Sequence, residues 1–154
     1  MASPMPLASA AERRVTLRML SYWERLRGSR AMPTEEDIDP YDLHDLWDCC
    51  FLLHVKDMDK PDYNYTYLGD EILQTLQEGT ENEAENFANP EIRELTKAYP
   101  QVVLTKKPVL EEGEFITTAG ASVKYRQCLL PLGEGSEVLA ILGAVRFKVF
   151  SLSL

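Results

Sequence analysis

The chain has 154 residues, of which 45% are hydrophobic and 27% charged, as expected for one globular domain long enough to bury its own core. This composition excludes collagen-like, low-complexity and wholly disordered proteins. The formal net charge of −9 argues against a nucleic-acid binder, which would neutralise phosphates with an excess of lysine and arginine.

The charge is unevenly distributed along the chain. Residues 1–30 carry six basic and two acidic side chains, whereas residues 31–100 carry four basic and eighteen acidic ones. Acidic segments of this kind keep a small protein soluble. The basic leading segment is open to two further interpretations, a cover over the acidic part of the chain or an attachment surface for a partner.

Residues 1–10 are expected to form a mobile tail, followed by an N-terminal helical segment over residues 11–30. Within the helical pattern of Ala8–Leu26, the apolar side chains at helical spacing form one stripe, which comprises Met19, Leu20, Trp23 and Leu26. The opposite face carries Arg13, Arg18 and Arg25. A basic amphipathic helix can lie on a membrane, but docking on its own domain through Trp23 is the favoured interpretation.

The segment Pro33–Pro40 (PTEEDIDP) is expected to lack regular structure because a proline stands at each end. Its carboxylates resemble a calcium loop only superficially, since the central glycine and distal glutamate of such a loop are missing. No metal site is therefore predicted. Asp39 and Pro40 instead predict a helix cap and first helical residue, followed by a short helix over Tyr41–Leu46.

The rest of the chain alternates between strand and helix patterns. Cys49–Val55 and Tyr63–Leu68 predict a hairpin, and Gly69 precedes helical spacing over Asp70–Gln77. An acidic loop over Gly79–Asn89 leads to a helix opened by Asn89-Pro90-Glu91 and broken near Ala98–Tyr99 by Pro100. Three strands close the chain, at Pro108–Thr118, Ser122–Leu132 and Glu137–Val149, with Gly133–Gly135 connecting the last two. This order predicts an α+β domain with a five-stranded antiparallel sheet.

The cysteines and the hydropathy of the chain predict a protein of the cytoplasm. Cys49, Cys50 and Cys128 are an odd number, two of them adjacent and none in a C-x-x-C spacing, so no zinc or redox motif is offered. We predict buried thiols, as in a reducing cytoplasm. No run approaches the roughly 18–20 apolar residues of a membrane span, and the first residues do not have the order of a secretory signal.

The element order and several local motifs resemble the PAS domain family. Tyr22-Trp23-x-x-Leu26-Arg27-x-x-Arg30 followed by Asp37-Ile38-Asp39-Pro40 resembles the leading signature of a branch of short, single-domain bacterial PAS-like proteins. Tyr65-x-Tyr67-x-Gly69, Leu129–Leu132 and Ile141–Ala144 resemble its strands. The likeness covers about residues 17–147. It implies a PAS-like domain over residues 31–150, with central helices beside the sheet and the N-terminal helix added to it.

PAS domains are sensory and interaction modules that hold a ligand or a partner, so the resemblance implies a regulatory module. Tyr63, Tyr65 and Tyr67 alternate along one strand and are expected to share a face. If that face is interior, their rings and hydroxyls form an amphipathic pocket, in which Arg126 from a nearby strand meets an anionic ligand. The alternative is that the rings pack beneath the basic helix with their hydroxyls in water.

A second group of candidate residues lies at the junction between the helix and the domain. Arg27, Arg30, Asp37 and Asp39 lie within one short stretch and are expected to form an ion-paired clasp, with Trp23 anchoring the helix. The alternative is a surface for a regulatory partner. That partner is expected to be a second copy, for example through an exchanged helix, or a separate signalling protein.

The sequence identifies no cofactor and no catalytic group. His44 and His54 are the only histidines, and neither stands at an obvious haem-ligand position; Asp70–Gln77 lacks the cysteine that flavin photochemistry would need. Phosphate-binding glycine loops and a nucleophile elbow are absent from the sequence. The enzyme alternative is a small cone-shaped α+β isomerase or hydratase, with His54 or Asp70 as base and the row of tyrosines as hydrogen-bond donors. A non-catalytic, cytoplasmic regulatory module is the favoured prediction.

Overall fold

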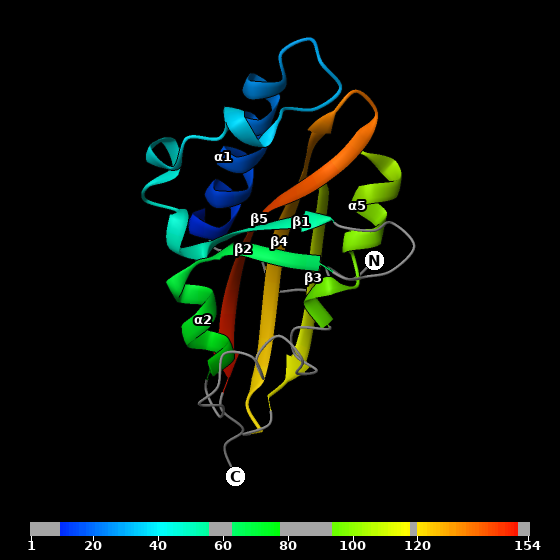
Figure 1. The fold of residues 1–154 in the computed structure, drawn as a ribbon. Helices are drawn as coiled ribbons and strands as arrows, with labels where there is room; N and C mark the ends of the chain where they lie inside the picture. The colour runs from blue at the N-terminus through cyan, green and yellow to red at the C-terminus, as the bar shows by residue number, and fades with distance from the viewer. Residues whose placement is uncertain (1–9, 56–62, 78–93, 118–119, 151–154) are drawn as a thin grey trace, which may run out of the picture.

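The computed structural model describes residues 10–55, 63–77, 94–117 and 120–150 (Figure 1). Residues 1–9 of the predicted tail, residues 56–62 with the hairpin turn, and residues 78–93 with the acidic loop and the helix start lie outside the described residues. Ala10, the last residue of the predicted tail, begins α1. The statements below concern the described residues alone.

The elements follow the predicted order. They are α1 (Ala10–Arg27), β1 (Cys50–Val55), β2 (Tyr63–Leu68), α2 (Asp70–Gln77), α5 (Tyr99–Thr105), β3 (Val109–Ile116), β4 (Ser122–Glu134) and β5 (Glu137–Phe150). The strands form one sheet in the order β2-β1-β5-β4-β3, in which every neighbouring pair is antiparallel. The predicted five-stranded α+β fold is confirmed.

The segment between α1 and β1 differs in detail from the prediction. It contains three 3-10 turns, η1 (Glu35–Asp37), η2 (Pro40–Leu43) and η3 (Trp47–Cys49). η1 falls inside the stretch expected to be irregular, because Thr34 and Asp37 form a reciprocal capping box around it. η2 begins as predicted, with the Asp39 side chain accepting a hydrogen bond from the Tyr41 amide at 3.0 Å, but it is a shorter and tighter turn than the helix expected there.

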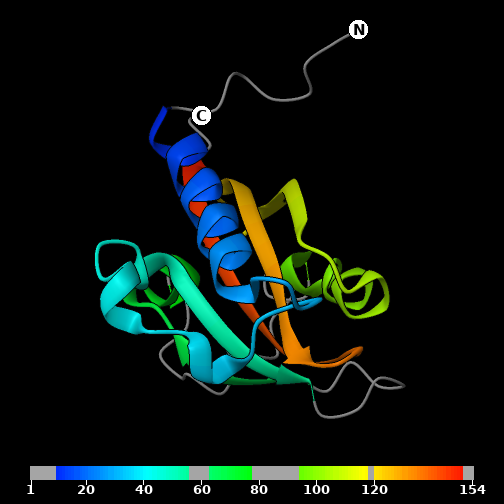
Figure 2. The ribbon, with the colours of Figure 1, turned by 90° about the horizontal axis from the view of Figure 1, so that it is seen from above.

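The two faces of the sheet can be followed through the strand register. Phe51, Gly143 and Leu129 are aligned across β1, β5 and β4, and the Phe51 ring lies 5.9 Å from the ring of Tyr99 in α5. We call this the α5 face. The neighbouring positions Leu52, Leu142 and Leu130 are also aligned and point the opposite way, toward the face that α1 covers (Figure 2). We call this second surface the α1 face.

α1 is part of the core. In its apolar stripe, Met19 is completely enclosed and Trp23 is only 4% exposed, and Leu20 and Leu26 are half-buried against the core. The Trp23 indole Nε1 donates a hydrogen bond to the backbone carbonyl of Pro131 in β4, at 2.8 Å. The favoured interpretation, docking of the helix on its own domain through Trp23, is confirmed. Gly28 follows the last helical residue with φ +59°, a left-handed conformation that glycine adopts at little cost.

The helix before β3 is interrupted at Pro100, as predicted. Residues 94–96 are helical, residues 97–98 form a turn, and α5 begins at Tyr99 with Pro100 in its first turn. Proline has no amide hydrogen to donate, and in the first turn of a helix none is needed. The break places the Tyr99 side chain, 1% exposed, against the sheet.

Candidate functional site

The predicted tyrosine row does not form one surface. The pairing of β2 with β1 shifts between Leu52 and Leu53, so that Tyr65 lies opposite Leu53 whereas Tyr67 lies opposite Leu52. Consecutive strand residues point to opposite faces, so Tyr65 and Tyr67 do not share the expected face. Tyr63 begins β2, but its side chain lies outside the described part of the structure.

Tyr65 belongs to an aromatic cluster on the α5 face. Its hydroxyl oxygen lies 2.7 Å from that of Tyr99, and its ring meets Phe51 edge-on, with centroids 5.8 Å apart. The Phe51 ring lies over Gly143 of β5, where an added Cβ would come within 2.1 Å of it. The glycine therefore allows the ring to lie directly on the strand, and this cluster fills the part of the α5 face beside α5.

Tyr67 has different neighbours. Its ring stacks on Trp47, with centroids 4.4 Å apart, and its hydroxyl donates a hydrogen bond to the Trp47 carbonyl at 2.9 Å. Burial of the side chain, together with the nearby Asp48 carboxylate, raises the pKa of Tyr67 to about 12. The phenol therefore stays protonated at neutral pH and helps to attach η3 to β2.

The strand register places Arg126 on the face of the sheet opposite to Tyr65. Tyr65, Leu53, Ile141 and Pro131 are aligned across the sheet, and Arg126 lies an odd number of residues before Pro131 in β4, so it points to the α1 face. There its guanidinium pairs with the Glu112 carboxylate at 3.0 Å. The alignment of β4 with β5 and β1 decides on which face of the sheet the Arg126 side chain lies, and the sequence does not reveal this alignment.

Sequence reasoning missed a buried polar group on the α5 face. Gln127 is 1% exposed, and its side-chain nitrogen donates to the Leu95 carbonyl at 2.9 Å and to the Glu111 carboxylate. Two acceptors around the nitrogen fix the orientation of the amide. The amide oxygen is buried and receives no hydrogen bond from the described residues. The one signal in the sequence is that Gln127 is a polar residue at a strand position where an apolar residue would be expected.

The predicted clasp forms in part. Arg30 pairs with Asp37 at 2.9 Å, whereas Arg27 pairs with Glu24 one turn away on α1, also at 2.9 Å. Asp39 serves as the cap of η2 and forms no ion pair in the described structure. The expected four-residue clasp is therefore reduced to one ion pair, because Arg27 and Asp39 find closer partners in their own elements.

The junction of α1 with the segment that follows it is held by contacts other than the predicted ion pairs. The Asp39 amide donates to the Tyr22 hydroxyl at 3.0 Å, and that hydroxyl donates to the Asp42 carboxylate at 3.1 Å. Arg18 of α1 forms a two-pronged ion pair with Asp45. Bidentate pairs of this kind fix orientation as well as distance.

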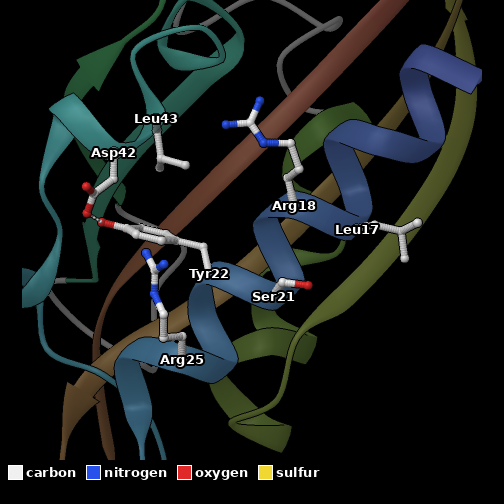
Figure 3. Close-up of a pocket in the computed structure, with 7 residues that line it drawn as sticks. All are labelled: Leu17, Arg18, Ser21, Tyr22, Arg25, Asp42 and Leu43. Atoms are coloured by element: carbon white, nitrogen blue, oxygen red, sulfur yellow. Dashed lines mark hydrogen bonds between the residues drawn. The ribbon is translucent and has the colours of Figure 1, made fainter.

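Beside these contacts lies an open groove of about 410 Å³, which we call the α1 groove (Figure 3). It is lined by Leu17, Arg18, Ser21, Tyr22, Arg25, Asp42 and Leu43. Figure 3 shows the two arginine side chains extending from α1 on either side of Tyr22, whose ring points toward Asp42. The groove combines apolar side chains, hydroxyl groups and charged groups of both signs on one accessible surface.

The histidines are surface groups. His54 lies near the end of β1, and its Nε2 contacts the Glu35 carboxylate of η1. His44 stacks on Tyr41, with ring centroids 5.7 Å apart. Within the described ranges, no group of three metal-ligating side chains is placed to hold a metal ion.

The three cysteines are buried and free, as predicted. Burial raises the pKa of the Cys128 thiol to about 12, so this side chain remains a protonated, small apolar group at neutral pH. None of the helices in the described part of the chain is both long and apolar enough to span a membrane.

A five-stranded antiparallel sheet with α5 packed on one face is compatible with the architecture of a PAS-type sensory or regulatory module. The comparison with protein families agrees: the model described as a PAS domain matches residues 11–146, and the chain belongs to the PAS domain family. The match does not test the narrower leading signature, which stays a prediction.

No curated protein matches the chain. Among solved structures, the chain is similar to the crystal structure of a LOV protein from Rhodobacter sphaeroides, with 14% sequence identity and a TM-score of 0.39, over 71% of this chain and 68% of that chain.

Proposed function

We propose that this protein is a non-catalytic PAS module that acts through contact with another protein, and that α1 provides the contact surface. The observation that carries the proposal is the α1 groove. The inner side of α1 is buried against its own sheet, yet its outer side presents Leu17, 61% exposed, next to the groove. An exposed apolar side chain with polar groups around it is typical of an interaction site.

The enzyme alternative needs hydrogen-bond donors beside His54 or Asp70 as base, and the row of tyrosines was expected to supply them. Tyr65 and Tyr67 do not share a face of β2, and their hydroxyls bond to the Tyr99 hydroxyl and to the Trp47 carbonyl. This arrangement favours the non-catalytic proposal.

A small-molecule ligand is the second candidate. The buried amide oxygen of Gln127, without a donor among the described residues, favours it, because buried acceptors are ordinarily satisfied. A ligand with an N–H or O–H group directed at this oxygen would supply the missing hydrogen bond. On the same proposal we place the protein in the cytoplasm, which the free cysteines favour, and in the bacterial branch indicated by the leading signature.

Native mass spectrometry of freshly purified protein, with an absorbance spectrum of the same sample, tests the proposal. We expect the mass of the bare chain, or of a simple multiple of it, and no absorbance band beyond those of tryptophan and tyrosine. A stoichiometric extra mass would instead identify a ligand sensor. Since Gln127→Leu removes the unsatisfied oxygen, loss of the extra mass in that variant would locate the ligand on the α5 face.

A further inference from the structure

β3 is an outer strand of the sheet, and its outer side is accessible. The strand order ends at β3, which pairs with β4 alone among the described strands (Figure 1). Every residue from Leu110 to Ile116 is exposed or half-buried. Alternate residues of an outer strand direct their amide hydrogens and carbonyl oxygens away from the sheet. β3 therefore presents backbone groups to which a further strand could bond.

The two outer strands of the sheet differ in how well they are protected against further pairing. Prolines, lysines and bulges are the usual protection of an outer strand. The pairing of β2 with β1 contains a register shift, and an irregularity of this kind bends and twists a strand. The pairing of β3 with β4 runs from Val109 to Ile116 without a shift, and β3 contains neither proline nor lysine. β3 is therefore the outer strand better suited to accept another strand.

The charge of β3 decides between possible occupants. The strand carries Glu111, Glu112 and Glu114 and no basic residue. If two copies paired antiparallel along the whole strand, Glu111 of each copy would lie opposite Glu114 of the other. A shift of one residue in either direction again places glutamates opposite one another. Like charges in directly opposite positions destabilise a strand pair, so β3 disfavours a second copy of itself.

Glu114 is the carboxylate most open to an incoming strand. Glu111 and Glu112 are engaged by side chains of β4. Glu114 is exposed and belongs to none of the ion pairs among the described residues. Its neighbour on β4 is Lys124, whose ammonium lies 5.4 Å from the centre of the Phe150 ring. A basic side chain on the incoming strand would supply the opposite charge to Glu114.

Two apolar side chains lie on the same side of β3 as Glu112 and Glu114. Leu110 and Ile116 are 55% and 66% exposed, and the four residues occupy alternate positions of the strand, so they share one face. An incoming strand would thus meet an apolar contact at each end and carboxylates between them.

We propose that the outer side of β3 binds an extended segment of a partner protein, which adds a strand to the sheet. Backbone hydrogen bonds hold the segment, as in other cases of strand addition. A basic side chain lies opposite Glu114, and apolar side chains pack on Leu110 and Ile116. This surface shares no residue with the α1 groove, so the inference goes beyond the proposed function and does not depend on it.

The test uses the full chain and short labelled peptides. The basic peptide has valine, lysine, lysine and valine at alternate positions, with threonine between them. The acidic peptide has glutamate in place of each lysine, and a third peptide repeats the basic sequence with N-methylated amides, which cannot donate to a neighbouring strand. In fluorescence anisotropy, we expect the acidic and the N-methylated peptides to bind about tenfold or more weakly than the basic peptide.

Hydrogen exchange measured by mass spectrometry locates the bound peptide. With the basic peptide present, the backbone amides of β3 should exchange more slowly, because strand addition gives the outward amides acceptors. The amides of β2, the other outer strand, should exchange at an unchanged rate.

Matched variants test the side-chain contacts. Glu114→Lys should weaken binding of the basic peptide about threefold or more and strengthen binding of the acidic peptide, because the cross-strand charge is inverted. Glu137→Lys makes the same reversal at an exposed residue of β5 and should change neither. Ile116→Thr should weaken binding of the basic peptide, whereas Leu104→Thr, at a leucine 76% exposed on α5, should not. Thermal melts establish that the variants fold.

Several results would overturn the inference. Undiminished binding of the N-methylated peptide would show a contact other than strand pairing. Equal binding of the basic and acidic peptides, or of neither, would remove the role of charge, and protection of amides outside β3 would place the peptide elsewhere. Self-association of the chain without peptide, with slowed exchange of the β3 amides, would make the occupant a second copy.

Discussion

Trp23 links the sequence signature to the structure most directly. The residue stands in the Tyr-Trp pair of the leading signature, and its ring is buried between α1 and the sheet. Its indole nitrogen donates to the Pro131 carbonyl of β4, and the Arg27 guanidinium lies 5.6 Å from its ring centre. Packing, a hydrogen bond and a cation–π contact therefore meet at one side chain.

Replacing Trp23 with alanine should lower the free energy of unfolding by ~3–5 kcal/mol, because a large cavity opens between helix and sheet. Trp23→Phe keeps most of the ring but loses the hydrogen bond, so its cost should be smaller, with about 1–3 kcal/mol from the unsatisfied Pro131 carbonyl. Urea denaturation of the three proteins measures both differences. Equal stability of wild type and Trp23→Ala would contradict the docking of α1.

The residue scale also shows where prediction from sequence ends. Trp23 was identified because an apolar stripe at helical spacing needs burial. Tyr65 and Arg126 were assigned to a common pocket from strand alternation and the usual order of the strands. The alignment of Tyr65 with Leu53, Ile141 and Pro131 instead places Arg126 on the face opposite to Tyr65. Pairing register depends on long-range contacts, and a local pattern does not contain it.

At the scale of elements, the strands and helices were predictable within a few residues, since each has a strong period and a clear boundary residue. Gly28, Pro40 and Pro100 each end or begin an element as their backbone chemistry requires. The 3-10 turns were not anticipated as such. They are stabilised by side-chain caps and by contacts with α1, such as that of Tyr22 with Asp42, between residues distant in sequence.

The Asp37 carboxylate joins η1 to the end of α1, and its ionisation contributes to the stability of the fold. The Asp37 side chain accepts hydrogen bonds from the Thr34 amide at 2.9 Å and hydroxyl at 3.1 Å, and it pairs with Arg30. The Thr34 amide first, and then Arg30 and the Thr34 hydroxyl, hold the pKa of Asp37 below its usual value. The ionised carboxylate therefore stabilises the fold above the pKa of the unfolded chain, about 3.9.

This linkage predicts a pH-dependent effect of Asp37→Asn. The variant should be less stable than wild type at neutral pH, and the difference should shrink as pH falls from about 5 through the lowered pKa of the folded state. Urea denaturation between neutral and acidic pH measures it. Glu36→Gln removes an exposed charge from the same turn without these contacts and serves as the control. A difference for Asp37→Asn that stays constant with pH would contradict the argument.

At the scale of the whole molecule, α1 completes the core. Leu130, Leu132 and Leu142 on the strands beneath it have no exposed surface, and the α1 face would be open to water without the helix. The sequence divides the chain into a helical segment and a PAS-like domain, but the packing joins α1, β4 and β5 (Figure 2). A helix that shares the core should unfold together with the sheet.

The two tryptophans can show whether α1 unfolds together with the sheet, because they lie in different parts of the fold. Trp23 lies on α1, and Trp47 stacks on Tyr67 beside β2. In Trp47→Phe the fluorescence follows α1 alone, and in Trp23→Phe it follows η3 and β2. In each variant we expect the urea transition seen by fluorescence to coincide with that seen by circular dichroism, as in two-state unfolding of one cooperative unit.

If Trp23 fluorescence in Trp47→Phe changes at lower urea than the circular dichroism signal, α1 separates from the sheet before global unfolding. The helix would then be an exchangeable element, and a contact made through α1 would compete with its docking on the sheet.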